Sequence, residues 1–84
     1  MDKLKRYRKS IDYTDKKIVK LLLLRFDLAK KVSKEKKLNR VKIIDKKRES
    51  EIMKNIKKYS NKKHQQFVKD IFKNIINYSR KLQR

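Results

Sequence analysis

The sequence predicts an all-α protein. It contains no glycine and no proline, the residues that most often mark turns and interrupt helices. Lysine, leucine and arginine, which favour helix, are abundant. Apolar side chains recur every three or four residues over long stretches, which is the spacing of one helix face. We expect one domain over residues 1–84, built from one long and two shorter helices.

The long helix is predicted to begin near Asp2 or Lys3 and to end near Leu38. One face alternates steps of four and three residues without a break, through Leu4, Arg8, Ile11, Asp15, Ile18, Leu22, Arg25, Ala29, Val32 and Lys36. A helix of about 35 residues is about 52 Å long, more than a compact chain of this size can cover. Part of this face is therefore expected to pack against a second copy of the chain.

Two shorter helices are predicted after a basic connector over residues 39–44. Asp45 has the position of the cap or first turn of the second helix. The inward face of that helix comprises Asp45, Arg48, Glu49, Ile52, Met53 and Ile56. The third helix follows the polar stretch 60–66, and its face is apolar from Phe67 to Ile76 and polar from Ser79 to Gln83.

The composition excludes several classes of site. There is no cysteine and only one histidine, so disulfides, thiolate metal sites and histidine clusters are ruled out and no metal is expected. No apolar run approaches the roughly 18 residues of a membrane span, and the lysine-rich N-terminus lacks the features of a cleaved leader, so we expect a cytoplasmic protein without membrane contact. The 29 basic and 9 acidic residues give a net charge of +20, which favours anionic ligands and nonspecific polyanion binding.

Three cations lie on the face of the long helix that also carries its aliphatic residues. Arg8, Arg25 and Lys36 share this side, so burying the aliphatic residues brings positive charge toward the interior. Buried cations are costly unless anions meet them. The pattern therefore predicts an anionic ligand held inside a helix bundle.

The spacing of the polar residues is more specific. The pattern runs from Arg8 to Arg25 and Lys36, continues as Asp-x-x-Arg-Glu at Asp45, Arg48 and Glu49, and ends as Ser-x-x-x-Gln at Ser79 and Gln83. Over nearly the whole chain this resembles the all-helical class of chorismate mutases. The resemblance implies three-helix protomers intertwined as a homodimer with two active sites. It also implies a cofactor-free isomerase that converts chorismate to prephenate in aromatic amino-acid biosynthesis.

The resemblance assigns the two carboxylates of chorismate to two arginines. These are Arg25 and the partner's Arg8, with Ser79 assisting at one carboxylate. Arg8 and Arg25 lie 17 residues apart, or about 25 Å along one straight helix, which is farther than a small dianion reaches. One chain cannot place both on one ligand, whereas antiparallel long helices of a dimer can. The active site and the dimer therefore require each other.

The remaining site residues are assigned by the same resemblance. Lys36 and Gln83 are assigned to contact the ether oxygen of chorismate, whose C–O bond breaks. Glu49, with the backbone around Asp45, receives the substrate hydroxyl, and Arg48 adds positive potential. The acids at positions 45 and 49 also suit a structural role, because negative charge stabilises a helix N-terminus.

Arg80 departs from the family pattern, in which a smaller and less charged residue is common beside the site. It is expected either to disturb the pocket or to point to solvent.

Two other functions remain open. One is a lyase of the same fold that removes pyruvate from isochorismate. Glu49 disfavours the lyase, because this residue suits the contact with the substrate hydroxyl in the mutase. A basic helical protein also suits nucleic-acid binding through phosphate contacts. The sequence shows no recognition-helix turn and no aromatic stacking platform, however, and its basic residues surround the helices instead of marking one face.

Overall fold

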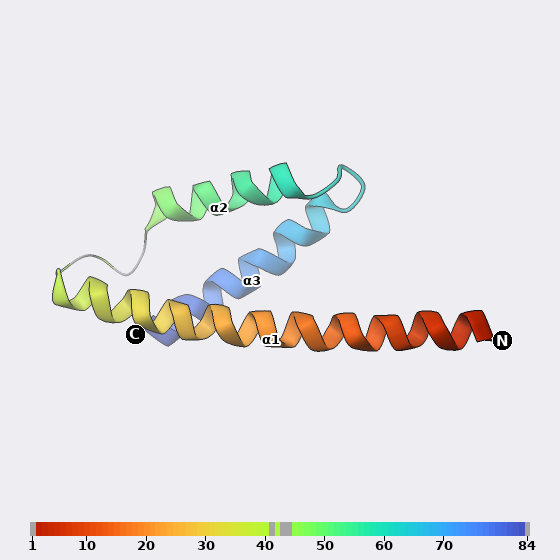
Figure 1. Cartoon of the computed structure of the whole chain (residues 1–84). Helices are drawn as coiled ribbons and strands as arrows, with labels where there is room; N and C mark the ends of the chain where they lie inside the picture. The colour runs from red at the N-terminus through yellow and green to blue at the C-terminus, as the bar shows by residue number, and fades with distance from the viewer. Residues whose placement is uncertain (1, 41, 43–44, 84) are drawn as a thin grey trace.

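A computed structural model describes residues 2–40, 42 and 45–83. The chain forms α1 (Asp2–Leu38), α2 (Lys46–Tyr59) and α3 (Gln65–Gln83), as Figure 1 shows. The prediction of one long and two shorter helices is confirmed. Of the predicted connector over residues 39–44, positions 41, 43 and 44 lie outside the described residues.

Local side-chain contacts explain where α2 and α3 begin. Asp45 has an extended backbone, and its carboxylate accepts a hydrogen bond from the backbone N–H of Arg48 at 3.0 Å, which confirms it as the N-cap of α2. Before α3, the Asn61 side chain accepts a hydrogen bond from the His64 N–H at 2.9 Å. The His64 carbonyl then accepts the first helical bond, from the N–H of Val68 at 3.0 Å.

The third helix connects the other two. Figure 1 shows α3 running from the end of α2 to the C-terminal half of α1. In the described residues α3 packs against both helices, whereas α1 and α2 have no Cα atoms within 8 Å of each other. The buried apolar side chains in this part of the chain are Ala29 on α1, Ile56 on α2 and Ile76 on α3. The core is therefore small, and α3 determines how α1 and α2 lie relative to each other.

The N-terminal half of α1 projects away from α2 and α3 (Figure 1). Every residue from 2 to 21 is exposed, including Leu4, Ile11 and Ile18. The radius of gyration is 16.3 Å, against about 12 Å for a compact chain of this length. Although many apolar side chains are exposed, no helix in the described ranges has the length and hydropathy needed to cross a membrane. The apolar face predicted from the sequence is thus largely uncovered within one chain.

Candidate active site

A cavity of about 280 Å³ lies among the three helices. Its lining includes seven of the eight predicted site residues, namely Arg25, Lys36, Asp45, Arg48, Glu49, Ser79 and Gln83. Aliphatic side chains such as Leu28, Val32 and Ile52 complete the wall. The residues selected by their spacing in the sequence therefore lie around one cavity in the fold.

Arg25 is a partly buried cation that lines this cavity. Its Nη1 donates a hydrogen bond to the Ser79 hydroxyl at 3.0 Å, and Ser79 in turn donates to the Ile75 carbonyl at 2.8 Å. Burial lowers the pKa of Arg25, and the positive charge of Arg48 lowers it further. No carboxylate among the described residues forms an ion pair with Arg25. Arg25 therefore holds a partly desolvated positive charge next to a neutral hydroxyl, which favours an anionic ligand.

The C-terminal end of α3 is fixed on α1 by a serine that the sequence analysis did not select. Ser33 is 5% exposed, and its hydroxyl donates a hydrogen bond to the backbone carbonyl of Gln83 at 3.0 Å. The side-chain Oε1 of Gln83 is buried and has no hydrogen-bond partner in the described part of the chain. An unsatisfied buried polar atom costs about 1–3 kcal/mol. Gln83 therefore lines the cavity with an amide oxygen that can still accept a hydrogen bond.

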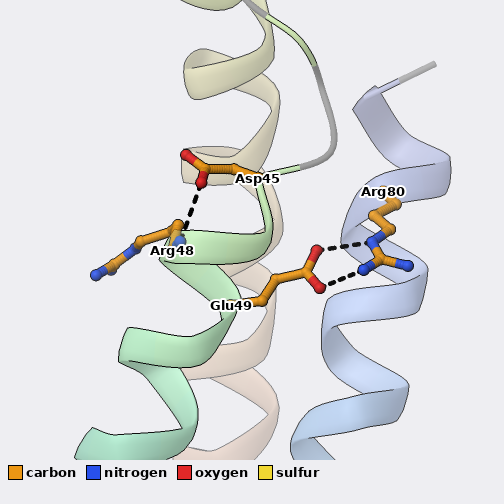
Figure 2. A network of polar contacts seen from close by, with 4 residues as sticks. All are labelled: Asp45, Arg48, Glu49 and Arg80. Carbon is orange, nitrogen blue, oxygen red and sulfur yellow. Dashed lines mark hydrogen bonds and ion pairs between the residues drawn. The ribbon is translucent and has the colours of Figure 1, made fainter.

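The second residue outside the predicted set is Arg80. It lines the cavity and forms a two-point ion pair with Glu49, shown in Figure 2. Arg80 Nε donates to Glu49 Oε2 at 2.8 Å, and Nη2 donates to Oε1. Hydrogen bonding to Glu49 raises the pKa of Arg80. Of the two outcomes expected for Arg80, exposure to solvent is wrong, because the guanidinium lies between α3 and α2.

Comparison with known proteins identifies the family. Residues 7–84 match the family model described as chorismate mutase type II. The chain belongs to this family. Comparison with curated proteins and with solved structures gave no match. Membership in the type II chorismate mutases confirms the resemblance found in the sequence and makes the protein an isomerase.

One predicted site residue of this chorismate mutase lies away from the cavity. Arg8 is exposed on the projecting half of α1, whereas Arg25 lines the cavity 17 residues later. That separation corresponds to about 25 Å along the helix. A single chain of the enzyme therefore brings together Arg25, Lys36 and the α2 and α3 residues, but not Arg8.

Positive charge dominates the chorismate mutase cavity. Its cations are Arg25, Lys36, Arg48 and Arg80, and its carboxylates are Asp45 and Glu49. Asp45 caps α2 and Glu49 pairs with Arg80, so both acids already have partners. Among the described residues, no three histidine, cysteine, aspartate or glutamate side chains group as metal ligands would. The arrangement suits a small anion carrying both acceptor and donor groups.

Proposed function

We propose that the protein rearranges chorismate to prephenate as a homodimer, in aromatic amino-acid biosynthesis. The observation that carries the proposal is the Arg25 guanidinium, held at the cavity by Ser79 and paired with no carboxylate of the described chain. In a type II chorismate mutase, the anion that this guanidinium suits is a carboxylate of chorismate.

The second carboxylate of chorismate requires a second cation. We assign it to Arg8 of the partner subunit, because the projecting half of α1 exposes both this arginine and an apolar face. The chain exposes 7811 Å², about 2,400 Å² more than a compact protein of this mass. Covering that excess on both chains would bury about 4,800 Å² in total, which lies in the range of obligate homodimers. Dimerisation would thus cover the apolar face and complete each site.

The reaction needs positioning more than reactive groups. The ether C–O bond of chorismate breaks while a C–C bond forms within the same molecule, and no atom enters or leaves. Binding both carboxylates would hold the enolpyruvyl arm over the ring, which lowers the entropic part of the barrier. Lys36 and Gln83 would oppose negative charge that develops on the ether oxygen, and one such preorganised donor is worth about 3–4 kcal/mol.

The opposite end of the cavity would receive the substrate hydroxyl. Glu49 lines the cavity from α2 and carries acceptor oxygens, and the backbone at Asp45 lies at the start of the same helix. Arg48 contributes positive potential, consistent with its effect on Arg25. These contacts would orient the ring relative to the two carboxylate sites.

The proposal is tested by incubating the purified protein with chorismate, following the loss of chorismate absorbance and identifying the product. We expect prephenate, and activity reduced at least a hundredfold in Arg25→Ala. A parallel incubation with isochorismate tests for released pyruvate. Unchanged chorismate, or pyruvate release alone, would refute the assignment.

A further inference from the structure

The ion pair between Arg80 and Glu49 differs from the other ion pairs in the described residues. Arg48 with Glu51 and Lys73 with Asp70 are pairs three residues apart on one helix, and their side chains are at least half exposed. Arg80 and Glu49 lie 31 residues apart on two helices, with side chains only 24% and 21% exposed. Exposed ion pairs within one helix contribute little to the stability of a protein. The Arg80–Glu49 pair instead connects two helices that line the cavity.

The geometry of the pair restricts the Glu49 carboxylate. Two nitrogens of one planar guanidinium meet its two oxygens, as Figure 2 shows. Such two-point contact fixes both the position and the plane of a carboxylate. Each carboxylate oxygen has two lone pairs, so a further donor can still bind. Glu49 therefore remains an acceptor on the cavity wall while its orientation is set by α3.

The pair also changes the electrostatics of the cavity. An uncompensated carboxylate in the wall would repel a ligand that carries two negative charges. The Arg80 guanidinium offsets this charge and leaves the carboxylate in place as an acceptor. Arg48 does not offset this charge in the structure, because its side chain turns away from Glu49 (Figure 2). It pairs instead with Glu51 at 3.3 Å.

We propose that Arg80 is a positioning residue for substrate binding, which holds and neutralises Glu49 so that a dianion carrying a hydroxyl can use this carboxylate as an acceptor. This inference rests on the proposed function, since it takes chorismate as the ligand that reaches Glu49. Arg80 acts through Glu49 and makes no contact with the reacting atoms.

Kinetics of three variants test this role. In Arg80→Met the guanidinium is lost, and we expect KM for chorismate to rise about tenfold while kcat changes less than about threefold. Arg80→Lys keeps the charge without the planar fork and should raise KM about threefold. Lys81→Met is the matched control, because it removes one charge from the adjacent exposed residue of α3, outside the cavity lining, and should leave both constants unchanged. Circular dichroism checks that each variant is folded.

A double-mutant cycle shows whether Arg80 acts through Glu49 or meets the substrate directly. In a Glu49→Ala background, Arg80→Met should change KM less than about twofold, because there is no carboxylate left to position. A tenfold rise in that background, or unchanged KM in the Arg80→Met and Arg80→Lys single variants, overturns the inference while chorismate turnover by the wild type stands. An inactive wild type instead overturns the proposed function and this inference with it.

Discussion

Two inactive variants of the enzyme should restore activity to each other, because Arg8 and Arg25 are proposed to serve one substrate from different chains. Both residues lie on α1, which runs without interruption from Asp2 to Leu38. Their separation of 17 residues is about 25 Å along the helix axis. A homodimer of Arg8→Ala has two sites that lack the partner's Arg8, and a homodimer of Arg25→Ala has two sites that lack Arg25.

The size of the recovery follows from counting sites. Removing one arginine that pairs with a substrate carboxylate costs about 3 kcal/mol, or roughly 150-fold in kcat/KM, so each variant alone is nearly inactive. In a mixed dimer one site carries both substitutions and the other carries neither. Random pairing of equal amounts makes about half of the dimers mixed. We therefore expect roughly one quarter of wild-type activity.

The experiment unfolds the two variants together in urea, refolds them by dilution and measures chorismate turnover. The matched control pairs Arg25→Ala with Lys36→Ala, since both residues belong to the same chain's site and every mixed dimer remains defective. Separately refolded variants mixed afterwards show whether chains exchange. No recovery above the control, with soluble dimers present, would refute the shared site.

Four further predictions concern the same site. Lys36→Ala should lower kcat more than about tenfold while circular dichroism shows unchanged helicity, and unaltered turnover would remove Lys36 from catalysis. Gln83→Glu should be active only near or below the ordinary glutamate pKa of about 4.3, where the carboxyl can donate, so a flat pH profile would contradict the donor role of Gln83. Ser33→Ala should lower kcat about threefold to tenfold and speed amide exchange at the end of α3, whereas unaltered exchange would show that Ser33 does not fix this end. Light scattering should show tighter dimers as salt rises from about 10 to 150 mM, because two chains of +20 repel each other; looser dimers would contradict this.

The fold could be predicted because helix formation in this chain is governed by local features. The unbroken period of α1 and the absence of glycine and proline indicated one long helix ending at Leu38. Asp45 marked the start of α2 because a short acidic side chain satisfies N–H groups within its own first turn. Seven of the eight predicted site residues line one cavity. They were recognisable because their spacing within and between helices is specific.

Arg80 and Ser33 could not be predicted in the same way. Arg80 is one of 29 basic residues, and its partner Glu49 is 31 positions away on another helix. Periodicity places residues on a face of their own helix but does not give the crossing of α2 and α3, which decides this pair. Ser33 donates to the backbone carbonyl of Gln83. Because every residue has such a carbonyl, the sequence does not indicate which one a serine will contact.

Two neighbouring side chains of α3, Ser79 and Arg80, connect the helices that surround the cavity. Ser79 and Arg80 are adjacent in sequence and point about 100° apart around the helix. Ser79 meets Arg25 on α1, and Arg80 meets Glu49 on α2. Because no Cα atom of α1 lies within 8 Å of one of α2 in the described residues, one turn of α3 sets the distance between the proposed carboxylate end and the hydroxyl end of the site. A rotation of α3 by one residue would break both contacts together, so the alignment of substrate depends on the register of this helix.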